Sequence, residues 1–308
     1  MKDFKYRFFL MLWKGLSLLP LRLHYFLSDV LIFPSLYYVS RYRRPLVHQQ
    51  LASCFPERTE EERSKIEKDF YHWLADYFVE TIKAMTMSRT EMMRRMHIEG
   101  VEQLEAEMQA EGRQFAFLYL GHYGNWEWIS SLPYWAQHTD EFGQIYHPLH
   151  NRVADRLFLR MRARAGATNI PMRHTLRTII EWKRAGKKGM VGFIADQLPK
   201  WEAMYHWRPF LHHDTSFMPG AEQIGTKVGA AYYYADITRP RRGYYHCVLR
   251  RLDLSPHLDS PYPATDAYST ALEQSIRQHP HLWLWTHNRW KRTREQWEEF
   301  ERHRAIKR

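Results

Sequence analysis

The sequence has few cysteines and no tract of biased composition, and both shortages exclude classes of protein. Two cysteines in 308 residues cannot make a disulfide framework or a zinc site held by thiolates, although a single pairing between them stays open. We therefore expect a protein of a reducing compartment. Internal repeats and low-complexity linkers are missing too, and 44% hydrophobic with 26% charged residues is ordinary for a folded chain. Collagen-like, coiled-coil and disordered classes are thus excluded.

The chain is rich in positive charge and in aromatic rings. Its 45 lysines and arginines exceed the 34 aspartates and glutamates, which gives a formal net charge of +11. Phe, Trp and Tyr make up 15% of the residues. Basic charge together with amphipathic rings suits a nucleic-acid surface or an anionic membrane interface, and composition does not choose between them.

Residues 8–40 form an apolar segment that favours the membrane. A spanning helix needs roughly 20 mostly apolar residues, and polar side chains interrupt this run. The interrupting residues are Lys14, Arg22, His24 and Asp29. Pro20 and Pro34 are expected to break any long helix. We predict that residues 1–45 form a helix or helical hairpin in the membrane interface, with Arg41, Arg43 and Arg44 against lipid headgroups.

Two other interpretations of this segment stay open. It could be a buried core helix, or a single span whose flanking Lys and Arg side chains reach the interface. The basic start resembles the first part of a signal peptide, but no small-residue cleavage site follows.

Residues 46–308 are predicted to form an α/β domain. Thr59 and Glu62 have capping-box spacing, which predicts a helix that runs to about Ala84. From Met96 onward, short apolar runs alternate with helical patterns, which is typical of α/β folds whose ligands bind beyond the carboxyl ends of the strands. Strands are predicted at 115–120, 143–146, 189–195, 230–238 and 244–252. Helices are predicted at 101–111, 125–136, 152–165, 176–185, 221–228 and 264–278, with a charged, solvated helix at 293–308.

The strongest chemical signal is Gly-His-Tyr-Gly-Asn-Trp-Glu at residues 121–127, directly after the first predicted strand. Two glycines permit a tight strand-to-helix turn, and Asn125 is a good N-cap. With His122 in the loop and Glu127 in the first helical turn, the two side chains can approach each other. We therefore predict that the Glu127 carboxylate holds one ring nitrogen of His122 while the other takes a proton from an acceptor hydroxyl.

Several blocks in order resemble one known family. They are residues 43–47, 54–57, 121–127, 146–151, 160–162, 194–197 and 285–291. This set resembles the bacterial lipid A biosynthesis (lauroyl/myristoyl-type) acyltransferases, within the glycerolipid acyltransferase superfamily that carries His-x4-Asp/Glu. The resemblance covers nearly the whole chain and implies an α/β fold with a central mixed sheet flanked by helices. His147 and the pair Gln49-Gln50 depart from the usual pattern of the family.

The resemblance implies a role for each matching residue. His122 is the general base, Glu127 its partner, and Arg162 and Asp196 are further active-site residues. The same blocks suggest a substrate-binding set, which consists of Asn125, Tyr146, Gln197, Arg289 and Lys291. No metal and no cofactor is expected.

The implied reaction moves a fatty acyl chain from a thioester of acyl carrier protein or coenzyme A to a hydroxyl of a lipid A precursor. The expected partners are that donor, a phosphorylated glycolipid and an anionic membrane surface, without nucleic acid. The expected location is the bacterial inner membrane, with the active site on its cytoplasmic side.

Three alternatives stay open at this stage. The same chemistry could acylate a lysophospholipid or another glycolipid. A basic nucleic-acid-binding protein is the alternative from a different class, although Lys and Arg are scattered and no reader motif is present. A zinc hydrolase could use His212-His213-Asp214 or His279 with His281, but adjacent side chains on a strand point to opposite faces, which makes poor ligand pairs.

Overall fold

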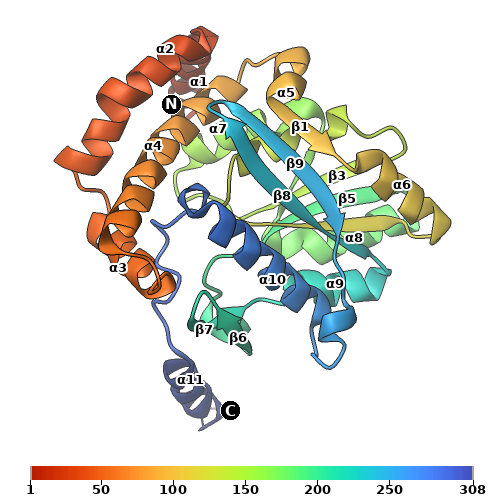
Figure 1. The fold of residues 1–308 in the computed structure, drawn as a ribbon. Coiled ribbons are helices and arrows are strands. Elements are labelled where there is room, and N and C mark those ends of the chain that lie inside the picture. Colours follow the sequence, from red (N-terminus) through yellow and green to blue (C-terminus); the bar gives the residue numbers. More distant parts are fainter. Residues whose placement is uncertain (1, 307–308) are drawn as a thin grey trace.

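A seven-stranded mixed sheet organises the protein (Figure 1). The structure is a computed structural model that describes residues 2–306. The strand order is β1-β9-β8-β2-β5-β3-β4, in which β8 and β9 pair antiparallel and all other neighbours pair parallel. The strands are β1 (Met96–Glu99), β2 (Phe115–Leu120), β3 (Glu141–Tyr146), β4 (Thr168–Pro171), β5 (Gly189–Ile194), β8 (Ala231–Arg241) and β9 (Tyr244–Arg251).

The centre of the sheet fixes where a site can form. All six residues of β2, Phe-Ala-Phe-Leu-Tyr-Leu, are buried, as expected for a parallel strand covered on both faces. β5 and β8 flank β2 and run parallel to it. The loops that follow β2 and β5 therefore leave the sheet at the same edge, side by side.

Helices surround this sheet, and α10 crosses in front of it in Figure 1. The α-helices of the domain are α3 (Arg44–Cys54), α4 (Glu60–Ala84), α5 (Arg89–Arg95), α6 (Val101–Ala110), α7 (Arg152–Arg162), α8 (Thr175–Arg184), α9 (Gly220–Val228), α10 (Pro263–Gln278) and α11 (Arg294–Ile306). Thr59 and Glu62 form the predicted capping box at the start of α4. The predicted α/β class, with a mixed sheet flanked by helices, is confirmed.

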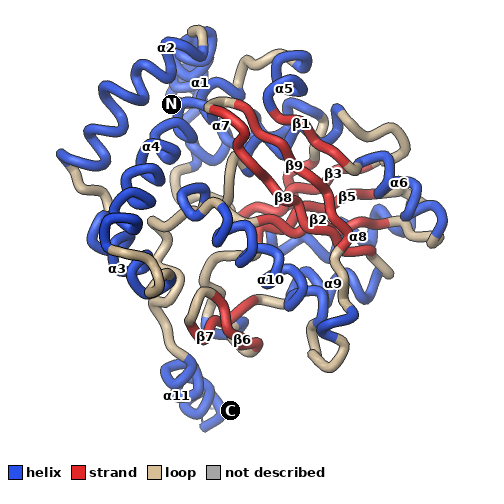
Figure 2. The backbone as a smooth tube through the Cα atoms, in the orientation of Figure 1, coloured by secondary structure: helices blue, strands red, loops and turns tan. Residues whose placement is uncertain are grey.

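Three local predictions are wrong or incomplete. The helix predicted at 125–136 is a 3-10 helix, Trp126–Tyr134, which contains Pro133. The short edge strands β1 and β4 were not predicted, because four residues carry too little periodicity. A separate antiparallel hairpin, β6 (His206–Phe210) and β7 (His213–Phe217), was also missed; it lies apart from the main sheet in Figure 2.

The N-terminal segment is a bent helical pair. α1 (Lys2–Leu18) ends before Pro20, as predicted, and α2 (Leu21–Leu27) starts after it. Pro34 does not end the helix. The chain on both sides of it is wound with wider π turns, Ser28–Ile32 and Ser35–Val39, in which the N–H of Phe33 pairs with the carbonyl of Ser28. Because proline has no N–H to donate, this wider winding lets the helix continue past Pro34 without that hydrogen bond.

Side chains of this segment dock on α4. Trp13 donates its indole N–H to the carbonyl of Ile82 at 2.9 Å, and Lys83 donates to the carbonyls of Ser17 and Leu19 at 3.0 Å each. Arg43 and Arg44, which were expected to face lipid headgroups, both have partners within the protein, and their contact with lipid stays a prediction. Arg44 pairs with Glu67 at 2.6 Å, and Arg43 donates to the carbonyl of Thr286 at 2.7 Å.

The outer face of the segment is apolar and exposed. Its exposed side chains include Phe4, Phe8, Phe9, Met11, Leu12, Leu16, Leu18, Leu23, Phe26, Val30, Leu31 and Val39. Within residues 2–306, no single helix has the length and apolar content needed to cross a bilayer. The stretches Phe4–Leu18 and Leu21–Val39 reach that length and apolar content only together, and a bend of 104° separates them.

Candidate active site

His122 and Asp196 lie together where β2 and β5 end. The ring Nδ1 of His122 is 2.7 Å from Oδ1 of Asp196, and the backbone N–H of His122 donates to Oδ2 at 2.9 Å. The indole of Trp283 donates to the same Oδ2 at 2.8 Å. Neighbouring parallel strands thus bring together two residues that are 74 positions apart in the sequence.

Both glycines of the tight turn after β2 lie close to neighbouring elements. A Cβ on Gly121 would lie 2.8 Å from Cδ1 of Leu272. Gly124 has a φ of +59°, in the left-handed region, and a Cβ there would lie 2.6 Å from Cγ2 of Ile237. Glycine at both positions lets the loop pass close to α10 and β8 while it presents His122.

The contacts of Asp196 fix the tautomer of His122. Burial acts to raise the pKa of Asp196, but the charge of His122 and the hydrogen bonds from His122 and Trp283 lower it to about 2. An ionised carboxylate only accepts hydrogen bonds, so Nδ1 of neutral His122 carries the proton. Nε2 then carries the lone pair, and the side-chain amide N–H of Gln197 donates to it at 3.3 Å. His122 is consequently oriented as a base.

Glu127 does not contact His122, so the predicted pairing of these two residues is wrong. Its carboxylate is buried and accepts two hydrogen bonds from Arg162 of α7, one of them from Nε at 2.7 Å. None of the hydrogen bonds or ion pairs among the described residues joins Glu127 to His122. The two carboxylates have separate functions, since Asp196 orients the imidazole and Glu127 holds a guanidinium.

Trp126 connects these two pairs. Its ring lies edge-on to His122, with centroids 5.1 Å apart, and stacks on Tyr77 at 4.2 Å. Burial and then the charge of Glu127 raise the pKa of Tyr77 well above its ordinary value, so its hydroxyl stays protonated. An apolar ring therefore packs beside His122 and limits its contact with water.

Asn125 is the N-cap that the sequence predicted, but it is not placed to bind substrate. Its side chain is fully buried, and Oδ1 accepts the N–H of Trp128 at 3.2 Å. Nδ2 donates to Glu80 at 2.7 Å. Both ends of the amide are thus engaged within the protein.

Arg289 also departs from the predicted substrate-binding role. Its side chain is 1% exposed and donates to the carbonyl of Ser216. Burial lowers its pKa to about 10, against the opposing charges of Asp196 and Tyr268. Its guanidinium lies over the ring of Phe217, 5.0 Å from the centroid, so its contacts are within the protein interior.

Lys291, in contrast, lines an open cleft of about 510 Å³ beside Gln197. The other lining residues are Arg43, Leu46, Leu198, Pro199, Lys200, His287, Asn288 and Arg292. Four lysines and arginines and no carboxylate line the cleft, so its potential attracts anions. Lys200, His287, Arg292 and Arg43 were not predicted from the sequence to line a cleft.

Tyr146 ends β3, one strand beyond β5 in the sheet order, and it is half-buried. Burial and then the charge of Asp155 raise its pKa. The positive charges of Arg173 and then Arg162 oppose this shift. The predicted residues therefore form two groups. His122 and Asp196 form a dyad next to Gln197, and Glu127 pairs with Arg162, while Tyr146 lies on the neighbouring strand.

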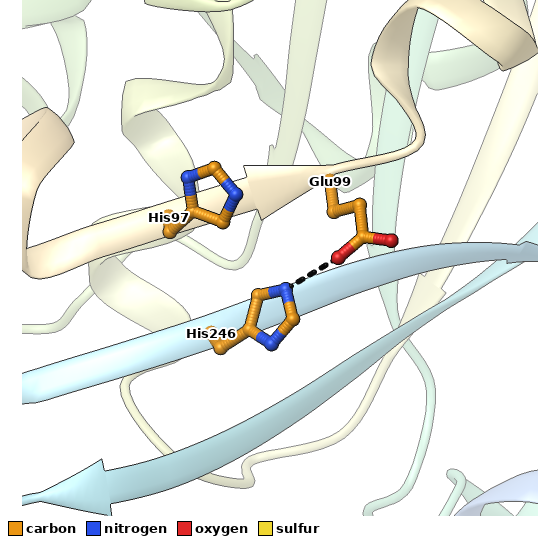
Figure 3. Close-up of side chains that lie close together, drawn as sticks. All are labelled: His97, Glu99 and His246. Atoms are coloured by element: carbon orange, nitrogen blue, oxygen red, sulfur yellow. Dashed lines mark hydrogen bonds and ion pairs between the residues drawn. The ribbon is translucent and has the colours of Figure 1, made fainter.

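One cluster of potential metal ligands occurs in residues 2–306, and it lies away from His122. His97 and Glu99 of edge strand β1 face His246 of β9, and the three ligand atoms lie within 4.8 Å of one another (Figure 3). His246 and Glu99 already form a hydrogen bond of 2.8 Å. The cluster is solvent-accessible, and no residue of the dyad takes part in it.

A mixed sheet with a histidine–carboxylate dyad beyond its central strands defines an α/β protein equipped for proton transfer. The sequence model of the bacterial lipid A biosynthesis acyltransferases matches residues 3–292, and the chain belongs to that family. It is therefore an acyltransferase of lipid A biosynthesis, a part of lipopolysaccharide biosynthesis. None of the curated proteins compared with the chain matches it.

Proposed function

We propose that His122 is the general base of acyl transfer from a thioester to a hydroxyl of a lipid A precursor. The observation that carries this proposal is the 2.7 Å contact between Nδ1 of His122 and Asp196, which leaves Nε2 unprotonated and thus able to accept a proton. As the hydroxyl oxygen attacks the thioester carbonyl, its proton moves to Nε2. The C–O bond forms, the C–S bond breaks, and the imidazolium returns the proton to the departing thiolate. Asp196 stabilises the imidazolium while it exists.

The cationic cleft supports a phosphate-bearing substrate. Lys200, Lys291 and Arg292 line it, and Leu198 connects it to the loop of Gln197. The acyl donors of this proposal, acyl carrier protein and coenzyme A, and its phosphorylated glycolipid acceptor all bring phosphates. Arg162, held by Glu127, is proposed to bind the donor or the acceptor through the N–H groups that Glu127 does not engage.

Residues 1–45 are proposed to bind the inner membrane with the active site on its cytoplasmic side. The exposed apolar side chains of α1 and α2 support this proposal, since they would enter the acyl boundary of an anionic bilayer. The acyltransferase domain, residues 46–308, would then meet its lipid acceptor at the headgroup level.

The test is an in vitro assay in detergent–lipid mixtures that offers acyl carrier protein and coenzyme A thioesters in separate arms. Each arm contains either a lipid A precursor or a lysophospholipid, and mass spectrometry identifies the product. We expect acylated lipid A precursor from the wild-type chain, and a loss of about 10²–10⁴-fold in His122→Ala. Undiminished turnover by His122→Ala would remove the mechanism, while transfer to the lysophospholipid alone would replace the acceptor. Full activity after chelation is expected.

A further inference from the structure

Glu80 of α4 is a fully buried carboxylate that the proposed reaction does not use. Its Oε1 accepts the hydroxyl of Tyr25 at 2.9 Å, and its Oε2 accepts Nδ2 of Asn125 at 2.7 Å and the hydroxyl of Tyr245 at 2.8 Å. Arg239 lies 3.9 Å from Oε1. All of these partners are donors or cations, so they suit an ionised acceptor.

These partners come from elements that are far apart in the sequence. Tyr25 belongs to α2 in the N-terminal segment, whereas Tyr245 and Arg239 belong to β9 and β8. Asn125 is the N-cap of the 3-10 helix that carries Trp126 and Glu127 and that begins at Trp126, shortly after His122. One carboxylate therefore joins the N-terminal segment to the loop of the proposed base.

Two further contacts make this joint stiff. The indole of Trp128 donates to the backbone carbonyl of Glu80 at 3.3 Å, and Oδ1 of Asn125 accepts the N–H of Trp128 at 3.2 Å. In a buried, low-dielectric position, each lost hydrogen bond leaves a polar group without a partner, so the arrangement is strongly specified.

We propose that Glu80 is a positioning residue that couples the docked N-terminal segment to the conformation of the catalytic loop, residues 121–134. When Tyr25 is in place, Glu80 holds Asn125, and Asn125 fixes the start of the 3-10 helix behind His122. The inference rests on the proposed function only for its activity readout, because the loop conformation can be measured without substrate.

The sharpest test is a charge swap between Glu80 and Asn125. Asn125→Asp places two carboxylates against each other where a 2.7 Å hydrogen bond was. We expect kcat to fall by about 10²-fold, because a misplaced loop displaces the base while the cleft still binds the donor with unchanged KM. The double variant Glu80→Gln with Asn125→Asp restores a donor opposite an acceptor, and we expect it to recover at least about tenfold of the loss.

Tyr25→Phe tests the other end of the joint with one atom removed. We expect faster amide hydrogen exchange in residues 121–134 and a several-fold lower kcat, with vesicle binding unchanged. Tyr38→Phe is the matched control, since this exposed tyrosine of the same segment is not a donor to Glu80. It should leave exchange in the loop and kcat as in the wild type.

The outcomes separate the two proposals. If the wild-type chain transfers no acyl group, the proposed function fails, and the exchange of residues 121–134 still tests the coupling. Wild-type kcat in Asn125→Asp, or no recovery in the double variant, would overturn the role of Glu80. Unchanged exchange in Tyr25→Phe would overturn the link to the N-terminal segment. Thermal unfolding of each variant identifies any that fail to fold, and in that case recovery of stability by the charge swap is the decisive measurement.

Discussion

The hydrogen bonds of Asp196 make its substitution by asparagine informative. Oδ2 accepts two donors, the N–H of His122 and the indole of Trp283, so the asparagine oxygen will occupy that position. Its amide nitrogen then faces Nδ1, which must become an acceptor, and the ring proton moves to Nε2. The imidazole is held in the wrong tautomer for a base.

We predict that Asp196→Asn lowers kcat by about 10²–10⁴-fold with little change in KM. Steady-state kinetics with the acyl donor measures the loss, and circular dichroism verifies that the fold is retained. Glu127→Gln is the comparison, because Glu127 does not contact the ring of His122. Retention of more than about a tenth of the activity in Asp196→Asn would mean that another group orients the base.

Arg162 and Glu127 form the second residue-scale prediction. Arg162→Met leaves the buried Glu127 carboxylate without its two hydrogen bonds, and the free energy of unfolding should fall by about 3–5 kcal/mol. The double variant Glu127→Gln with Arg162→Met should recover much of this, because no unpaired charge remains.

Urea denaturation of the single and double variants checks this prediction. Arg160→Met, at an exposed position of the same helix, is the control and should change stability by less than about 0.5 kcal/mol. An unfolding free energy of Arg162→Met equal to that of the control would contradict a buried, paired Glu127.

The sequence indicated candidate site residues, but it did not indicate correctly which of them contact one another. His122, Glu127, Arg162 and Asp196 were all singled out, and His122 and Asp196 do meet. The local spacing of His122 and Glu127 allowed a contact, but the actual partners are 74 and 35 positions away. Such pairings depend on which strands are neighbours, and local spacing carries no information about that.

At the scale of elements, the N-terminal segment provides the test of membrane binding. Phe8, Phe26 and Leu31 expose 51%, 58% and 59% of their surface, and each buried CH₂ contributes about 0.8 kcal/mol. We predict that Phe8→Ser, Phe26→Ser and Leu31→Ser together weaken binding to anionic vesicles at least about 10²-fold, while thermal stability is unchanged.

Vesicle flotation measures the binding. Leu258→Ser with Ile306→Ser is the control, since these apolar residues are even more exposed, at 72% and 82%, but lie outside the segment. Equal binding by the triple variant and the control would refute the membrane role of α1 and α2.

Long elements were predictable, whereas short or unusually wound ones were not. The six-residue apolar run of β2 and the capping box of α4 each carry a strong local signal, and both appear with the predicted bounds. The 3-10 helix at Trp126–Tyr134 was mistaken for an α-helix, because its apolar pattern does not distinguish the two windings. The π turns around Pro34 have no sequence signal that we recognise.

For the whole molecule, the sheet order brings the site together. Because β2 lies between β5 and β8, loops that are separated in the sequence meet at one edge. The C-terminal stretch then closes that edge, as Trp283 donates to Asp196 and His287 accepts the N–H of Leu198 at 3.1 Å. The class of fold was predictable from the alternation of strands and helices, but strand order was not, because it depends on long-range packing.

This closing contact predicts how stability depends on pH. Burial lowers the pKa of His287 from 6.5 to about 4; Asp196 opposes the shift, and the charges of Arg289, His122 and Arg43 add to it. The folded state therefore binds fewer protons than the unfolded state between these two values, so stability falls as pH falls from about 6.5 towards 4. The geometry agrees, because a protonated Nε2 could not accept the N–H of Leu198.

We expect the thermal midpoint of the wild type to drop across this pH window, and the drop to be smaller in His287→Gln. Glutamine keeps an oxygen that can accept the N–H of Leu198 but takes up no proton there. Differential scanning calorimetry at steps from pH 7 to pH 4.5 compares the slopes, so a constant offset between the proteins does not affect the result. His150→Gln, at an exposed histidine, should keep the wild-type slope. Parallel slopes for all three proteins would show that His287 takes up its proton without leaving the fold, and that the closing contact is not what acid disrupts.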